Sequence, residues 1–446
     1  MPKKKPRRIS PYADRMGRFI GQLRVHEGIT LKQLSRGLCE YSFLNKIENG
    51  ERQVGKLLMD AFFQRLGKPV DFFGRILNRR EFVKWTQRQE IISYLRTGNT
   101  EKARECAQNY RVDKTCVLDR QFLTIVEIDC HALEGMSAQE LFSLVTNALL
   151  LTQPDLGKVP FDKLLLSQNE ERLLLAYLQL REELGGSAAV AEEYRALTQH
   201  PRCESRGRVQ LLVPCEEPGY VYCVNQVIRS RRALLGFSQE DLSDDTCGLR
   251  SVSRIENEDR KLQRKNRKQL LQKVNLSGER YDCEVISEHY EDCLLTGKLN
   301  RAVNAGDLEE ACRLLGILRE RLPELPTNRQ YILKTEAEIF ARYPEDHPDR
   351  ISVGEQRKLL EDALHLTLPL DIGRIDSWPA GILSINEINA LMMIALCYTQ
   401  EEQMDKNLAI LSYIKSCLET TEADLAYYAD INARLAEMFP EQLECV

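Results

Sequence analysis

The sequence contains no apolar run that approaches the ~18–20 residues needed to cross a membrane as a helix. Its basic start, MPKKKPRRIS, is not followed by the apolar segment of a secretory signal. The 14 cysteines include no CxxC pair and lack the spacing of a disulfide framework. We therefore expect reduced thiols, no membrane partner and a cytoplasmic location.

The motifs of common enzyme classes are also missing. There is no P-loop, no GxGxxG, no HExxH and no GxSxG. His289 lies near Cys293, and His200 near Cys203, but neither pair has the further ligands that a zinc site needs. We expect core or surface positions for these four residues, and we expect no enzymatic activity, no metal and no cofactor.

The net charge of −5 is unevenly distributed. Residues 1–90 contain 20 Lys and Arg against 9 Asp and Glu, and residues 226–280 contain 13 against 8. Because the remainder must then be strongly acidic, the sequence predicts two polyanion-binding segments on an acidic scaffold. Solvated helix faces would give the same composition. The basic segments therefore indicate polyanion binding only where they coincide with a motif.

The chain contains an internal duplication with a shift of 208 residues. The letters IEN in FLNKIENGER (43–52) return in VSRIENEDRK (252–261), and the same shift relates TGNTEKA (97–103) to AGDLEEA (305–311). After small insertions, RQFLTIVE matches RQYILKTE, NALLLT matches DALHLT, and LSQNE matches LSINE. We infer two copies of one unit of roughly two hundred residues. They join near residues 200–223, a segment rich in Pro, Gly and charge.

Helical patterns dominate both copies and predict an all-α fold. Met16, Ile20 and Leu23 recur at the spacing of one helix face. Ser-x-x-Glu capping boxes mark helix starts at matching places in the two copies. The boxes are Ser137/Glu140, Ser167/Glu170, Ser352/Glu355 and Ser384/Glu387.

Each copy also contains two short helices joined by a tight turn. In the first copy a helix begins near Thr30 and the next at about Tyr41, and in the second copy Ser238 and Asp241 suit the matching cap. The expected inward positions are Leu34, Leu44 and Ile47, and Leu242, Val252 and Ile255. This plan is that of a helix-turn-helix, whose last helix presents its other face to the DNA major groove. Any small helical bundle shares the amphipathic pattern, and the basic surroundings and repeated spacing favour DNA.

These stretches resemble the Xre/Cro type of helix-turn-helix, which follows the pattern Arg-x3-Gly-ϕ-[ST]-Gln-x2-Leu-[AS] and then ϕ-x-x-Ile-Glu-Asn-Gly. TGNTEKA and AGDLEEA resemble the turns between tetratricopeptide-like repeats, and LSINEINALMMIALCY (383–398) resembles their inner helices. The combination resembles the RRNPP group of bacterial quorum-sensing transcription regulators. The resemblance implies two partners, double-stranded DNA and a short signalling peptide held by the repeats. Two motifs in one chain depart from that group's usual plan of one.

The resemblance assigns structural and DNA-binding roles to matched residues. Arg24 with Glu48, and Arg232 with Glu256, match the family's buried ion pair between the first and the recognition helix. Gln239 matches a phosphate-contacting Gln, where the first copy has Leu31. The other implied DNA-binding residues are Tyr41, Ser42, Asn45, Lys46 and Arg52 in the first copy, and Leu249, Arg250, Ser253, Arg254 and Arg260 in the second. Arg and Lys suit guanine and Asn suits adenine.

We predict four domains from these patterns. They are a helix-turn-helix domain with a basic tail at 1–75, helical repeats at 76–205, a linker with a second helix-turn-helix domain at 206–280, and helical repeats at 281–446. One chain would then act as a pseudo-dimer on DNA, although a homodimer is also compatible with the sequence. The second copy has Glu258 where the family, like Gly50 in the first copy, has Gly.

Three further points stay open at this level. The KKKPRR tail fits a DNA-contacting arm, a solubilising tail or a targeting signal, whereas RKLQRKNRK (260–268) directly follows the second motif. Asn147, Asn169, Asn386 and Asn389 fit contacts to an extended peptide, or cap and loop positions. The alternative to a ligand-responsive transcription regulator is a protein-interaction scaffold with vestigial DNA-binding lobes.

Overall fold

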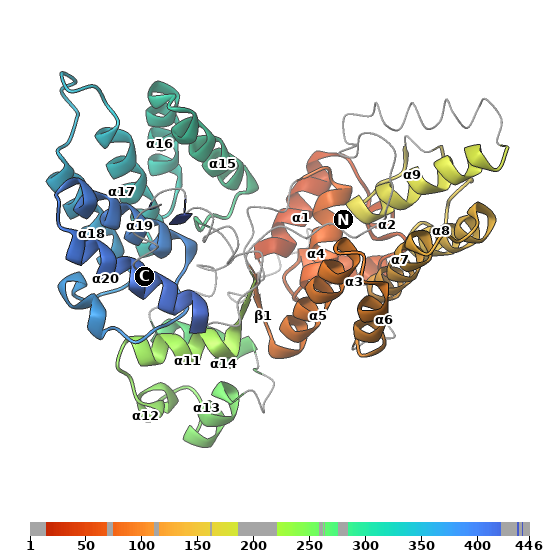
Figure 1. Ribbon diagram of the computed structural model, residues 1–446, viewed down its shortest axis with the longest axis horizontal. Helices are drawn as coiled ribbons and strands as arrows, with labels where there is room; N and C mark the ends of the chain where they lie inside the picture. The colour runs from red at the N-terminus through yellow and green to blue at the C-terminus, as the bar shows by residue number, and fades with distance from the viewer. Residues whose placement is uncertain are drawn as a thin grey trace, which may run out of the picture. The chain divides into compact units, whose positions relative to one another are not determined.

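The computed structural model describes residues 15–68, 75–110, 116–160, 163–185, 221–257, 262, 264–274, 284–420, 435–436 and 439. This part of the chain is mostly helical, in agreement with the predicted class, and it divides into two compact units (Figure 1). The first unit comprises residues 1–71 and 83–218, and the second comprises residues 72–82 and 219–446. None of the helices in the described ranges has the length and apolarity needed to span a bilayer.

The first unit consists of a small lobe followed by a stack of longer helices. The lobe contains α1 (Arg15–His26), α2 (Leu31–Ser35), α3 (Tyr41–Glu48) and α4 (Lys56–Arg65). The stack contains α5 (Arg79–Arg96) from Val83 onward, α6 (Thr100–Gln108), α7 (Val117–Leu133), α8 (Ala138–Thr152) and α9 (Gln168–Glu183). From α6 to α9, each helix packs against the next one along the chain.

The second unit repeats this plan and adds a short sheet. Strand β1 (Arg75–Leu77) pairs in parallel with β2 (Val221–Cys223), with Ile76 opposite Tyr222. Its lobe contains α11 (Val224–Leu234), α12 (Gln239–Ser243), α13 (Leu249–Glu256) and α14 (Arg264–Lys273). Its stack contains α15 (Tyr290–Ala305), α16 (Leu308–Arg321), α17 (Pro326–Ala341), α18 (Val353–His365), the 3₁₀ helix η3 (Ile372–Ser377), α19 (Ile385–Gln400) and α20 (Met404–Thr420).

Helix boundaries in the two lobes agree with the predicted duplication. The bounds of α12, α13 and α14 are those of α2, α3 and α4 moved by the same 208 residues that relate the sequences. The side chains of Thr30 and Ser238 form the capping boxes that start α2 and α12. All six predicted inward residues of the lobes are buried. The local sequence pattern therefore determines the lobe in both copies.

The stacks share their caps and a buried polar network. All four predicted serines stand at the N-cap of a helix. Gln121 on α7 donates to the hydroxyl of Thr152 at 2.7 Å, and Gln330 on α17 donates to the hydroxyl of Thr367 at 2.6 Å. These matched hydrogen bonds join corresponding helices, so the duplication extends through the stacks. Their tetratricopeptide-like character remains a prediction.

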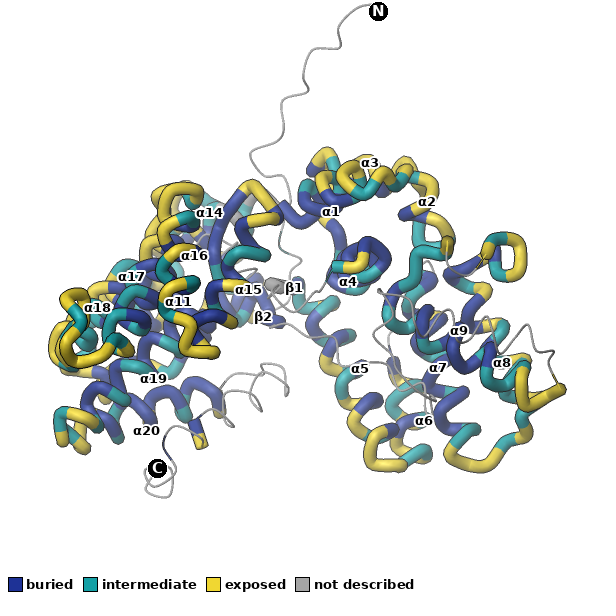
Figure 2. The backbone as a smooth tube through the Cα atoms, turned by 90° about the horizontal axis from the view of Figure 1, so that it is seen from above, coloured by how far each residue is buried: buried dark blue, intermediate teal, exposed yellow. Residues whose placement is uncertain are grey.

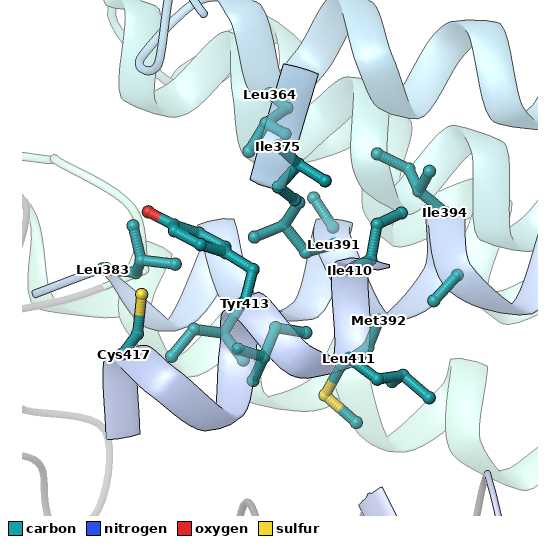
Figure 3. Packing of buried hydrophobic residues seen from close by; sticks show 14 of the residues in the cluster. Leu364, Ile375, Leu383, Leu391, Met392, Ile394, Ile410, Leu411, Tyr413 and Cys417 are labelled. Atoms are coloured by element: carbon teal, nitrogen blue, oxygen red, sulfur yellow. The ribbon is translucent and has the colours of Figure 1, made fainter. Parts of the chain in front are cut away.

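One hydrophobic core of the second stack lies between α18, η3, α19 and α20, and another lies among α15, α16 and α17. Leu364, Ile375, Leu391 and Ile410 come from these four elements and converge in one buried cluster (Figure 3). Tyr413 and Trp378 pack edge to face at one side of it, with ring centroids 5.4 Å apart. The cluster also includes Leu234 of the lobe, so lobe and stack share this core.

A glycine allows the first and third helices of the first lobe to approach closely. A Cβ atom at Gly17 would overlap the carbonyl oxygen of Ile47 in α3. In the second lobe Asn225 occupies the matching position, and its amide donates to the carbonyl of Ile255 at 2.5 Å. The first and third helices thus meet through backbone contact in the first lobe and through a side-chain hydrogen bond in the second.

We predict that Gly17→Ala destabilises the first lobe by about 1–3 kcal/mol through overpacking. The matched control is Gly316→Ala in α16, where an added Cβ meets nothing within 4 Å. Because alanine favours helix more than glycine, this control should stabilise slightly, by about 0.5–1 kcal/mol. Urea unfolding of the full chain, followed by helical circular dichroism, measures both changes. Equal effects of the two substitutions would contradict the proposed close contact.

Candidate nucleic-acid interface

A two-pronged ion pair fixes α3 to α1 in the first lobe. Nε and Nη2 of Arg24 each donate to one carboxylate oxygen of Glu48 at 2.7 Å. The remaining nitrogen, Nη1, donates to the carbonyl of Ile29 in the α1–α2 turn at 2.8 Å. The hydrogen bond to Glu48 raises the pKa of Arg24 further above its usual value. One mostly buried guanidinium therefore ties together α1, the turn after it and the end of α3.

The second lobe contains the same pair with an additional hydrogen bond. Arg232 donates to the two oxygens of Glu256 at 2.7 and 3.0 Å, and its Nη1 donates to the carbonyl of Phe237 at 2.8 Å. The amide of Gln239 also donates to Glu256, at 2.7 Å. The amide nitrogen of Gln239, for which the resemblance implies a phosphate contact, is thus engaged inside the lobe. Leu31 at the matching position has no amide to offer.

Both third helices expose the face opposite their buried residues. Tyr41, Ser42, Asn45 and Lys46 are exposed on α3, and Arg52 is exposed just beyond it. On α13, Leu249, Arg250 and Arg254 are exposed and Ser253 is half-buried. Exposed residues follow the outer side of α3 (Figure 2). The structure therefore brings the implied base-contacting residues of each copy onto one accessible helix face.

Some of the implied DNA contacts lie outside the described residues. These are Arg260 and the KKKPRR tail; Glu258, which stands where the family has Gly, also lies outside them. Within the described part, Lys32 on α2 adds a charge that the motif does not include, with its Nζ 5.7 Å from the ring centre of Tyr41. Phe43, whose exposed fraction is 36%, adds a second aromatic ring to the α3 surface. The motif does not include Phe43. An aromatic residue on the polar face of an amphipathic helix is the sequence feature that could have indicated it.

The first turns of α3 and α13 have no side-chain cap. Glu40 at the N-cap of α3 makes no capping hydrogen bond with its side chain, and Gly248 at the N-cap of α13 has no side chain to make one. Backbone N–H groups at a helix start are suitable donors to a phosphate, and the helix dipole favours a negative charge there. Each exposed helix thus combines side chains that can contact bases with backbone groups that can contact a phosphate.

The two exposed faces differ in chemistry. In the first lobe the face combines an aromatic ring, a hydroxyl, an amide and one ammonium group, on Tyr41, Ser42, Asn45 and Lys46. In the second lobe Arg250 and Arg254 supply two guanidinium groups. A guanidinium can donate two hydrogen bonds to the major-groove edge of guanine, whereas an amide suits adenine. The same lobe fold therefore presents two chemically different exposed faces.

The second stack contains side-chain amides that bind the backbone of a neighbouring segment. Asn328 on α17 accepts from the amide of Ile286 at 2.7 Å and donates to the carbonyl of the same residue at 2.9 Å. Asn386 on α19 donates to the carbonyl of Glu284 at 2.9 Å. The segment Val285–Ser287 between them is buried. Side-chain amides of this stack thus bind the backbone of a segment of the same chain.

Only part of this amide site was indicated by the sequence. Asn386 is among the four asparagines considered above, whereas nothing in the pattern singles out Asn328. In the first unit the matching residue is Asp119, whose carboxylate accepts from Lys84 and, at 2.8 Å, from the hydroxyl of Tyr110. Asn147 is exposed on α8, and Asn169 is half-buried at the start of α9. The four asparagines do not form one set.

Comparison with protein-family models, with curated proteins and with solved structures finds no match for this chain. Among the residues that the structure describes, no three or more His, Cys, Asp or Glu side chains are grouped so that they could hold a metal ion.

We predict that Arg24→Met lowers the stability of the first lobe by about 3–5 kcal/mol, because it leaves the Glu48 carboxylate mostly buried without its partner. Urea unfolding of the full chain measures the loss. Arg313→Met is the control, since the Arg313–Glu310 pair on α16 is exposed and should move the midpoint little. The double variant Arg24→Met/Glu48→Leu should recover part of the loss. A loss no larger than in the control would show that the pair does not fix α3.

Proposed function

We propose that the chain is a DNA-binding transcription regulator that contacts double-stranded DNA through α3 and α13 and responds to a ligand through its helical stacks. The observation that carries this proposal is the repeated lobe geometry. Each lobe holds a short third helix with the same arginine–glutamate pair and leaves the opposite face exposed, with polar or charged side chains. This is the arrangement that the recognition helix of a helix-turn-helix requires.

Some of the exposed side chains would contact bases and others would contact phosphates. Arg250 and Arg254 would contact guanine edges, and Asn45 would contact adenine. Lys46 and Arg52 would contact phosphates, together with the N–H groups at the start of each helix. Phosphate contacts supply most of the affinity and place the helices, whereas base contacts supply the specificity.

A single chain would supply both of the helices that contact the two half-sites of the DNA. Single-domain helix-turn-helix proteins dimerise to place two identical helices about one turn of DNA apart. Here α3 and α13 belong to one chain and carry different side chains. We therefore propose an asymmetric operator, with the half contacted by α13 richer in guanine.

The resemblance to peptide-sensing regulators implies a short peptide as the ligand, and the second stack offers an example of the contact, in which Asn328 and Asn386 bind backbone of the chain itself. Asn328 binds both backbone groups of Ile286, which is a contact that does not depend on the side chain of the bound residue. A short extended peptide would offer the same backbone groups. The stacks would then couple its binding to the position of the lobes that are attached to them.

We predict that DNA affinity depends steeply on salt and on the exposed basic residues. In the double variant Lys46→Gln/Arg254→Gln, the slope of log affinity against log salt should fall by ~0.9 for each phosphate that the protein no longer neutralises. Fluorescence anisotropy with a labelled duplex measures the slope. Arg313→Gln, an exposed cation on α16, should leave it unchanged. An affinity independent of salt in the wild-type protein would favour the interaction scaffold instead.

We predict that Arg250→Ala relaxes specificity at one half-site by about 1–3 kcal/mol and leaves the other half unchanged. Ser42→Ala in the first lobe should affect only the opposite half. Binding to a set of operator variants with single base-pair changes measures both effects. A palindromic operator whose two halves respond equally to Arg250→Ala would mean that a homodimer uses the second motif twice.

A further inference from the structure

Each stack contains the same buried acceptor site for a guanidinium. In the first unit it consists of the Glu170 carboxylate, in the first turn of α9, and the carbonyl of Thr152 at the end of α8. In the second unit Glu387 and Thr367 take these places. A backbone N–H of the N-cap serine, Ser167 or Ser384, donates to each carboxylate at 2.7 Å. We call this the guanidinium site.

The arginine that fills the guanidinium site comes from different helices in the two units. Arg65 on α4 donates to Glu170 at 2.5 and 3.1 Å and to the carbonyl of Thr152 at 3.1 Å. Arg231 on α11 donates to Glu387 at 3.2 Å and to the carbonyl of Thr367 at 2.8 Å. Helix α11 is the counterpart of α1, not of α4. The two lobes therefore dock on their stacks by different faces.

Neighbouring contacts agree with two docking modes. In the first unit the α2–α3 turn lies on the stack, where Arg36 pairs with Asp155 and a Cβ at Gly37 would overlap the carbonyl oxygen of Thr152. In the second unit the first helix of the lobe lies on the stack. There the hydroxyl of Ser230 accepts from the amide of Ile382 at 2.6 Å, and Leu234 joins the core of the stack.

At three matched positions each copy has a residue that its own docking mode needs and that the other copy lacks. These positions are 65 and 273, 37 and 245, and 23 and 231. Position 65 is Arg and its counterpart is Lys273, which donates to the carbonyls of Asp241, at 3.0 Å, and Asp244 within its own lobe. Position 37 is Gly, and its counterpart Asp245 has a positive φ of 56° and a side chain for which the first mode leaves no room. Arg231 has Leu23 as its counterpart, which carries no guanidinium.

We propose that these three positions select the face by which each lobe docks on its stack. Gly37 and Arg65 select docking through the α2–α3 turn and α4. Arg231 selects docking through the first helix, and Asp245 excludes the alternative by steric overlap and by placing a carboxylate against a carbonyl oxygen. The same lobe fold is thus presented in two orientations relative to the same guanidinium site.

The two docking modes connect the stacks to the exposed helices by different routes. In the first unit the docked turn leads directly into α3, and Arg65 also donates to the carbonyls of Leu34 and Arg36 at 3.1 and 2.6 Å. In the second unit Arg231 contacts the stack and its neighbour Arg232 contacts Glu256 of α13. If the proposed DNA binding is correct, a ligand-induced shift of α8 or α9 would move α3 directly. A shift in the second stack would reach α13 through α11.

Hydrogen exchange of the full chain tests the docking rule without DNA, so its failure would leave the proposed DNA binding untouched. Gly37→Asp should release the first lobe and make amides at the start of α9 and in the α2–α3 turn exchange at least about tenfold faster. Amides of α1 and α3 should keep their protection, because the Arg24–Glu48 pair is intact. Gly28→Asp is the matched control, since Gly28 has a similar positive φ, 67° against 71°, but nothing within 4 Å.

A second variant keeps the test decisive if Gly37→Asp unfolds the lobe. Arg65→Lys introduces the residue of the second copy, which can still cap the carbonyls of α2 but cannot make the two-pronged contact to Glu170. It should accelerate exchange at the start of α9, with no change in the second unit. If Arg65→Lys leaves this exchange unchanged, or if Gly37→Asp behaves like Gly28→Asp, these positions do not select the docking face.

Discussion

The bidentate pair between the first and third helices is the contact on which the exposed faces of both lobes depend. A helix as short as α3 or α13 is not stable alone, because nucleation costs more than so few hydrogen bonds return. Leu44 and Ile47 hold α3 to the core, and Arg24 fixes its rotation and its far end through Glu48. The same guanidinium satisfies the Ile29 carbonyl, so the turn before α2 is fixed as well. Arg232 repeats each of these contacts in the second lobe.

A second class of arginine connects each lobe to its stack, and it specifies orientation more than it adds stability. Taking a carboxylate and a guanidinium out of water costs several kcal/mol each, so a buried pair returns little net free energy. Burial tends to raise the pKa of Glu170, but the charge and hydrogen bonds of Arg65 outweigh it, and the pKa is lowered. Because the pKa of Glu170 is lower in the folded than in the unfolded chain, its ionised carboxylate stabilises the fold at neutral pH. This stabilisation is lost as the pH falls through the folded pKa. An unpaired charge here would be costly, which excludes other docking orientations.

The lobes could be predicted from the sequence because their determinants are local or repeat at a fixed spacing. Capping residues such as Thr30 and Ser238 lie within three residues of the groups they satisfy, and the Arg24–Glu48 spacing returns unchanged as Arg232–Glu256. Contacts between distant segments could not be predicted. A three-residue strand such as β1 is too short to show alternation, and its partner β2 lies more than one hundred residues away. The roles of Arg65, Arg231 and Asn328 depend on which helix ends meet in the folded stack. The internal partner of Gln239 was missed because a motif position does not specify which way a side chain turns.

Selection of bound sequences from a random pool of duplex DNA, with the full chain, tests the central claim most directly. If α3 and α13 of one chain each contact DNA, the selected sequences will contain two unlike short motifs at a fixed separation. The motif that disappears in Arg250→Ala will be the one richer in guanine. A pool that shows no enrichment after repeated rounds at low salt would contradict the claim that these exposed helices bind DNA.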